Sequence, residues 1–203
     1  MSEAKKTRSE LKRSAILQGA VEAFKAYGVN DTSMDKIAEV AQVSKRTVYN
    51  HFESKEVLVT HIIKDIWCKK VVSYDVPYSP DLPLRGQLVE LVENELNLSK
   101  QPDTVELIRV AITESINNPD IFNQEVHQFF EQDTALIRWL KAAKADNRFK
   151  EMDPHKANEQ IVSLIKGQAF WPQIIRFDSP LTVEQSTVLA NDTVDMFLAY
   201  YQV

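Results

Sequence analysis

The segment VSKRTVYNHF, Val43–Phe52, concentrates polar side chains of several kinds among a few apolar ones. Ser44 is a residue type that caps helices, and Val48 and Phe52 are four residues apart, which places both side chains on one helix face. We therefore predict a short helix over 45–52 whose apolar pair points inward. The side chains expected to point outward or sideways are Lys45, Arg46, Thr47, Tyr49, Asn50 and His51.

A second short helix is predicted immediately before this one, over 33–41. Thr32 is expected to cap it, and Ala38 and Ala41 supply small side chains on its inward face. Small residues let two helices cross closely at a steep angle, and about three residues join the pair. The spacing indicates a helix-turn-helix. An exposed surface helix of a helical bundle would explain the polarity of 45–52, but not this spacing.

A helix with a polar, basic N-terminal end suits the DNA major groove, which admits one helix. Arg46 and Lys45 can donate to guanine O6 and N7, and Thr47 can touch a thymine methyl group or a phosphate. Free N–H groups where the helices at 33 and 55 begin are natural phosphate contacts. The predicted DNA-binding residues are Thr32, Ser33, Lys45, Arg46, Thr47, Tyr49, Asn50, His51 and Lys55.

The whole chain is predicted to be all-α, because it has only 4 glycines and lacks long alternating Val/Ile/Thr runs. About nine helices are expected. Those outside the segment above are predicted near 8–27, 54–72, 84–99, 103–117, 119–146, 155–177 and 182–201. Three prolines interrupt helical periodicity within 74–86. We therefore predict a DNA-binding domain over 1–55, a connecting helix over 54–73, and a second helical domain over 74–203.

Charge differs between the two parts of the chain. Residues 1–70 hold 13 Lys/Arg and 9 Asp/Glu, whereas residues 71–203 hold 11 and 20. A polyanion is attracted to the first part and repelled by the second. The charged N-terminus, the single cysteine and the absence of a run of about 18 apolar residues predict a cytoplasmic protein without a membrane partner.

Catalytic and metal-binding patterns are not found in the sequence. The 4 histidines are scattered, and there is no Gly-rich phosphate loop or GxSxG nucleophile motif. We therefore predict neither an enzyme nor a cofactor or metal site. Cys68 lies beside Lys69 and Lys70, so it is either a redox-sensing thiol or an inert residue on an apolar helix face.

The segment TSMDKIAEVAQVSKRTVYNHFESKEVLV resembles the DNA-binding signature of TetR-type (TetR/AcrR) transcriptional regulators. Their T-[LVI]-Y-x-x-F core is similar to Thr47–Phe52, and their S-K-E-x-L motif to Ser54–Leu58. The ending Phe24…Tyr27-Gly28 of the preceding helix is similar too. Arg46 departs from the pattern, because many members have glycine there.

The resemblance implies a repressor that binds a palindromic operator in double-stranded DNA as a homodimer, paired through its last two helices. It also implies release by a small apolar or aromatic effector bound within the second domain. Candidate pocket residues are Trp67, Arg109, Phe129, Phe130, Trp139, Gln168 and Trp171. The alternatives are that the aromatic residues of this set and the apolar rows of the last two helices are plain intramolecular core, that the protein is a regulator or architectural protein without an effector, or that it senses redox state through Cys68.

Overall fold

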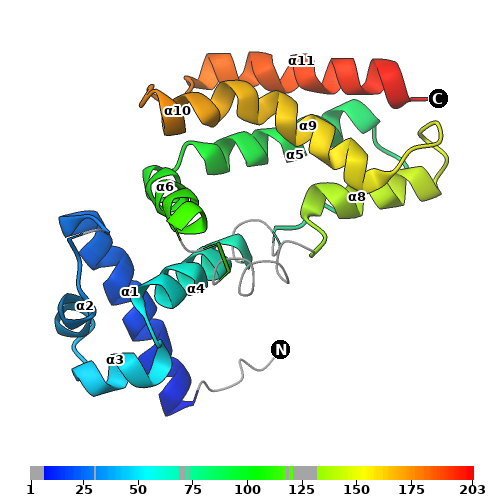
Figure 1. Ribbon diagram of the computed structural model, residues 1–203. Helices are drawn as coiled ribbons and strands as arrows, with labels where there is room; N and C mark the ends of the chain where they lie inside the picture. The colour runs from blue at the N-terminus through cyan, green and yellow to red at the C-terminus, as the bar shows by residue number, and fades with distance from the viewer. Residues whose placement is uncertain (1–6, 30, 69–71, 73, 118, 121–131) are drawn as a thin grey trace. The chain divides into compact units, whose positions relative to one another are not determined.

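In a computed structural model, the described residues are 7–29, 31–68, 72, 74–117, 119–120 and 132–203 (Figure 1). This part of the chain contains ten helices and no strand, apart from an isolated β-bridge between Phe149 and Gln202. The all-α prediction is confirmed. No helix in the described part is long and apolar enough to span a bilayer. The chain divides into two compact units, Met1–Asp65 with Val110–Phe130 and Ile66–Arg109 with Glu131–Val203.

Helix α1 (Arg8–Tyr27) opens the first unit with the predicted bounds. Thr7 and Glu10 form a capping box at its start. At its end, Gly28 has a φ of +77° and its N–H donates to the backbone oxygen of Phe24 at 2.8 Å. A positive φ costs glycine nothing, so the chain turns sharply there toward α2.

Helices α2 (Met34–Val40) and α3 (Lys45–His51) follow, and three residues separate α3 from α4 (Lys55–Trp67). Val48 and Phe52 are 0% and 1% exposed, which confirms the predicted inward face. The predicted cap of α2 is wrong. Ser33, not Thr32, accepts the backbone N–H of Lys36, because the chain enters the helix one residue later than expected.

The second unit is built on α5 (Leu84–Ser99), α9 (Pro154–Ala169) and α11 (Val183–Tyr201), which lie side by side (Figure 1). α8 (Ala135–Ala145) packs against α9, and α6 (Pro102–Asn117) follows α5 in the chain. Trp139, Phe149 and Phe197 meet edge to face in the core, with ring centroids 5.8–6.1 Å apart. This geometry is the preferred one for aromatic pairs.

Two predicted helices are interrupted in the structure. The helix expected over 119–146 is broken, since residues 132–134 are not helical and Thr134 caps α8. The helix expected over 155–177 ends at Ala169, and the short α10 (Trp171–Ile175) follows it. Pro172 has no N–H to continue the α9 hydrogen-bond ladder, which accounts for the second break.

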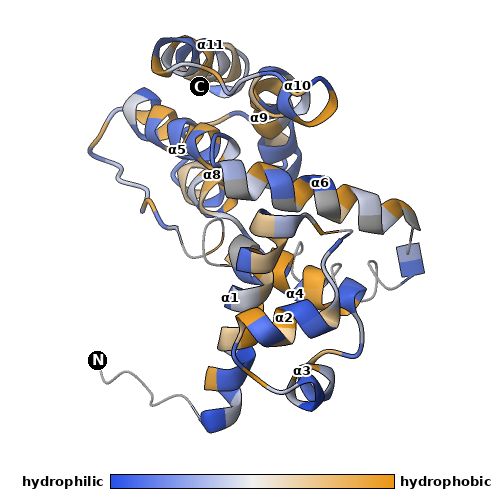
Figure 2. Cartoon of the chain, turned by 90° about the vertical axis from the view of Figure 1, so that its left-hand side faces the viewer, coloured by the Kyte–Doolittle hydropathy of each residue, from blue (hydrophilic) through white to orange (hydrophobic). Residues whose placement is uncertain are grey.

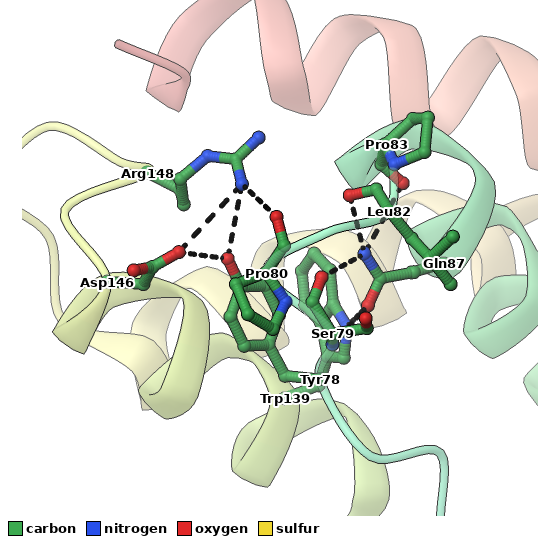
Figure 3. A network of polar contacts seen from close by, with 9 residues as sticks. All are labelled: Tyr78, Ser79, Pro80, Leu82, Pro83, Gln87, Trp139, Asp146 and Arg148. Atoms are coloured by element: carbon green, nitrogen blue, oxygen red, sulfur yellow. Dashed lines mark hydrogen bonds and ion pairs between the residues drawn. The ribbon is translucent and has the colours of Figure 1, made fainter.

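Gln87 fastens the proline-rich segment to the second unit (Figure 3). Its amide nitrogen donates to the backbone oxygens of Ser79, Leu82 and Pro83 at 3.0–3.4 Å. Its amide oxygen accepts from the Ser79 N–H at 2.8 Å and from the indole N–H of Trp139 at 3.2 Å. One buried side chain therefore satisfies part-buried backbone groups and the buried indole N–H of Trp139.

A second set of contacts holds the same segment from the other side (Figure 3). The Tyr78 hydroxyl donates to Asp146 at 2.5 Å, and Arg148 donates to Tyr78 and to the backbone oxygen of Pro80, both at 3.3 Å. Burial, and then the hydrogen bond to Asp146, raises the pKa of Tyr78 above its usual value. The tyrosine therefore stays protonated and remains a donor.

Candidate nucleic-acid interface

The pose of α3 is set by contacts at both of its ends. At its start, the Ser44 hydroxyl accepts the Thr47 N–H at 3.1 Å, and the Val43 N–H donates to the backbone oxygen of Ala38 at 3.0 Å. The first contact caps α3 and the second fixes the turn after α2. With Val48 and Phe52 buried behind it, the helix has little freedom to rotate.

Phe52 anchors the end of α3 against two other helices of the same unit. Its ring meets the His61 ring of α4 edge to face at 5.5 Å, and the Arg13 guanidinium of α1 lies 5.1 Å from its centroid. Arg13 also contacts His61 Nδ1 at 3.0 Å, where the nitrogen must act as acceptor because a guanidinium only donates. Sequence periodicity did not reveal this support, since its three members are far apart in the chain.

The outer face of α3 is polar, as the hydropathy colouring shows (Figure 2). Arg46, Tyr49 and Asn50 are exposed, with Tyr49 at 54% despite its large ring. His51 is half-buried, and the half-buried Thr47 shares a hydroxyl–hydroxyl hydrogen bond with Ser44 at 2.7 Å. The side chains of Arg46, Tyr49 and Asn50 therefore present hydrogen-bonding groups to solvent on this face.

Lys45 is held by an ion pair that the sequence did not suggest. Its ammonium group pairs with the carboxylate of Asp35 in the first turn of α2. A similar pair joins Lys36 to Glu39 on α2 at 3.1 Å, and this hydrogen bond raises the pKa of Lys36. The Lys36 ammonium also lies 4.9 Å from the Tyr27 ring centroid.

Two side chains predicted to contact phosphates donate hydrogen bonds within the first unit instead. Thr32 is only 1% exposed, and its hydroxyl donates to the backbone oxygen of Gly28 at 2.6 Å. The Thr32 hydroxyl is therefore engaged within the unit, and its phosphate contact stays a prediction. The Lys55 ammonium donates to the backbone oxygen of Val29 at 3.0 Å. Ser33 remains exposed at the start of α2, where its hydroxyl is the cap.

The predicted effector residues do not converge on one site in the described structure. Trp139 is 1% exposed in solid core, whereas Gln168 and Trp171 are exposed. Phe129 and Phe130 lie outside the described residues, as does the side chain of Trp67 in α4.

Arg109, the remaining predicted effector residue, makes contacts that join α6 to α10 in the second unit. It donates to Glu106 at 2.7 Å and to the backbone oxygen of Gln173 at 2.6 Å, and its guanidinium lies 4.3 Å from the Phe177 centroid. The Gln173 amide donates in turn to the backbone oxygen of Ser99 at the end of α5, at 3.0 Å. These contacts give Arg109 a structural role at the ends of α5 and α10.

Two ionisable groups lie half-buried on neighbouring helices of the second unit. Burial raises the pKa of Glu95 on α5 and lowers that of Lys166 on α9, and each group partly offsets the shift of the other. The Lys166 ammonium lies 5.9 Å from the Phe170 ring centroid. Neither residue was predicted, because isolated charges on amphipathic helices resemble ordinary surface charges in a sequence. Elsewhere in the described residues, no group of three His, Cys, Asp or Glu side chains forms a metal site.

The second unit also exposes an apolar face on α9 and α11. Met196 and Tyr200 are 60% and 70% exposed, and Val188 and Leu164 are exposed as well. A groove between the two helices is lined by Leu164, Leu181, Val188 and Met196 with several polar residues. We call the four exposed residues Leu164, Val188, Met196 and Tyr200 the α9–α11 face.

The buried anchor, the capped turn and the polar outer helix define a helix-turn-helix DNA-binding regulator. Comparison with known families gives the same result. Residues 16–62 match the family described as "Bacterial regulatory proteins, tetR family", and residues 86–203 match "AefR-like transcriptional repressor, C-terminal domain". The chain belongs to the TetR family of transcriptional regulators, whose members and relatives are regulators rather than enzymes.

Individual relatives agree with this assignment. A solved TetR-family regulator from Pseudomonas syringae pv. tomato is 34% identical, with 95% of this chain and 97% of that one covered and a TM-score of 0.76. The flavonoid-responsive regulator FrrA is 27% identical, with 95% and 98% covered and a TM-score of 0.71.

Among curated proteins, the regulator RutR of Escherichia coli K12 is 26% identical over 141 residues, which are 66% of this chain. The chain spans 64% of the length of that relative.

Proposed function

We propose that the protein is a repressor that binds a palindromic operator as a homodimer and releases it when a small effector binds. In this proposal residues 1–55 contact DNA, 54–73 form the connecting helix, and 74–203 hold the dimer interface and effector site. The observation that carries the DNA-binding part is the fixed pose of α3, with Val48 and Phe52 buried and Arg46, Tyr49 and Asn50 exposed. We place the protein in the cytoplasm, where bacterial operator DNA is found.

DNA binding is tested by selecting duplexes from a randomised library with the full chain and measuring affinity by fluorescence anisotropy at fixed salt. Arg46→Ala should weaken the selected duplex by about 1–3 kcal/mol if Arg46 bonds a guanine edge. Tyr49→Phe should weaken all duplexes alike, because a phosphate contact carries no sequence information. Lys141→Ala, on α8, is the matched control for lost charge. Failure of the wild type to enrich any sequence would remove the proposal.

The homodimer is proposed because the α9–α11 face leaves large apolar side chains in water along two adjacent helices. Monomers rarely expose contiguous apolar patches of this kind, and a second copy of the same face would cover them. A dimer also brings two α3 helices to one DNA molecule. One such helix reads too few base pairs to select a genomic site, whereas two read both halves of a palindrome.

Light scattering tests the dimer. The wild type should have twice the chain mass of 23.3 kDa at micromolar concentration. Met196→Glu should shift it to the monomer, because an interface buries the new charge without a partner. Ile116→Glu is the matched control, since Ile116 is also a highly exposed apolar residue, on α6. A wild-type monomer would remove the dimer from the proposal.

For the effector, we propose an aromatic molecule of the flavonoid class. The support is the relative FrrA, which is flavonoid-responsive and matches nearly the full length of this chain. An effector displaces DNA only through a higher affinity for the conformation that does not bind DNA. Naringenin should therefore weaken binding of the selected duplex at least tenfold, while lauric acid, an apolar molecule without rings, should not. An unchanged DNA affinity with naringenin would favour a regulator without such an effector.

A further inference from the structure

The ion pair between Asp35 and Lys45 joins the two helices of the helix-turn-helix on its open side. Asp35 is the second residue of α2, and Lys45 is the first residue of α3. Both side chains are well exposed, at 51% and 67%, so the pair stays accessible to a ligand from solvent. Because Lys45 begins α3, the pair lies at the N-terminal end of this helix, which is the end that contacts base edges in helix-turn-helix proteins.

The pair changes what the two neighbouring basic residues offer to DNA. For Arg46, no carboxylate partner is found among the described residues, so its full charge is available to phosphates or bases. The charge of Lys45 is balanced by Asp35. A neutral pair gains little from a phosphate, because approach to the polyanion attracts the ammonium group and repels the carboxylate. Lys45 is therefore a poor non-specific anchor.

The same pair matches the edge of a G·C base pair. In the major groove, guanine presents the acceptors N7 and O6, and its cytosine partner presents the N4 amino donor beside them. The Lys45 ammonium has three N–H donors, so it can keep its bond to Asp35 and still donate to guanine. The Asp35 carboxylate has further lone pairs that accept from cytosine N4. An A·T pair also places an acceptor, adenine N7, beside a donor, the N6 amino group, but only the G·C pair offers the ammonium group two adjacent acceptors before the donor.

We propose that Asp35 and Lys45 act as one unit that reads a single G·C base pair in each half-site. This inference rests on the proposed DNA-binding function and adds the base pair that is read. Asp35 is then a specificity-determining residue. It reduces binding to arbitrary DNA and increases discrimination at one position.

The test uses the full-length protein, the duplex it selects, variants of that duplex with each base pair exchanged, and an unrelated duplex of equal length. For the wild type, replacing one particular G·C pair in a single half-site by A·T should weaken binding by roughly 5- to 150-fold. Asp35→Asn keeps the side-chain shape but removes the charge. It should reduce this preference to about twofold or less and strengthen binding of the unrelated duplex. The salt dependence on that duplex should steepen by about one counterion per half-site.

Two further variants make the result specific to the pair. Glu39→Gln removes a carboxylate that also pairs with a lysine on α2, so it should leave the base preference intact. Lys45→Gln should abolish the preference as Asp35→Asn does, but without tighter binding of the unrelated duplex. Retention of the G·C preference by both Asp35→Asn and Lys45→Gln would overturn the inference alone. A wild type that selects no sequence would overturn the proposed function as well.

Discussion

Gly19 lies where α1 packs directly against the end of α2, and replacing it with alanine is the sharpest test of how this unit is packed. A Cβ atom at position 19 would lie 2.7 Å from the Ala41 Cβ and 2.8 Å from the Ala41 backbone Cα and N. Non-bonded carbon atoms rest about 3.5–4.0 Å apart. Gly19→Ala therefore requires α1 and the end of α2 to separate by about 1 Å.

The size of the effect follows from two opposing contributions. Alanine is favoured over glycine inside a helix by about 1 kcal/mol. Overpacking costs about 1–3 kcal/mol, and the upper end applies here because two of the three contacted atoms are backbone atoms that cannot rotate away. We expect the free energy of unfolding of this unit to fall by about 1–2 kcal/mol, which is roughly a five- to thirty-fold increase in the equilibrium constant for unfolding.

Hydrogen exchange followed by mass spectrometry measures this locally, on peptides covering 8–27 and 34–51. Gly167→Ala is the control, because Gly167 is an exposed residue of α9 with nothing within 4 Å of an added Cβ. That variant should slow exchange in α9 through helix propensity alone. If Gly19→Ala slows exchange in α1 and α2 as well, the close approach of Gly19 to Ala41 is refuted.

Three other substitutions probe the second unit. Gln87→Leu leaves the buried Trp139 indole and the Ser79 N–H without acceptors, so the free energy of unfolding should fall by about 2–4 kcal/mol. An unchanged urea midpoint, measured by tryptophan fluorescence, would contradict this. Burial raises the folded-state pKa of Glu95, so the contribution of Glu95 to stability is full below the unfolded pKa of about 4.3 and is lost as pH rises through the folded value. The stability of Glu95→Gln relative to the wild type should therefore rise between pH 4 and pH 7. The stability of Lys166→Met relative to the wild type should fall over the same range. If the pH profiles of the variants and the wild type are parallel, Glu95 is not a buried carboxylate with a raised pKa.

Much of the local structure was predictable because its signals lie within a few residues of each other. The bounds of α1 and α5 follow from apolar periodicity and adjacent turn residues, and those of α11 were predicted to within one residue. The buried pair Val48 and Phe52 follows from the helical repeat alone. In these cases each hydrogen bond or cap involves residues at most four apart, so a short stretch of sequence contains the whole cause.

Tertiary structure decided which side chains are available to a ligand. Thr32 was predicted to cap a helix or contact a phosphate, but the turn after Gly28 buries its side chain. Trp139 was predicted to line an effector pocket, but its side chain is buried in the core. The pairing of Asp35 with Lys45 depends on the angle at which α2 and α3 cross. A helical pattern fixes which residues share a face, but not which residues of another helix that face will meet. The sequence by itself therefore determined the helix-turn-helix and its family, whereas packing determined which polar groups remain free to act.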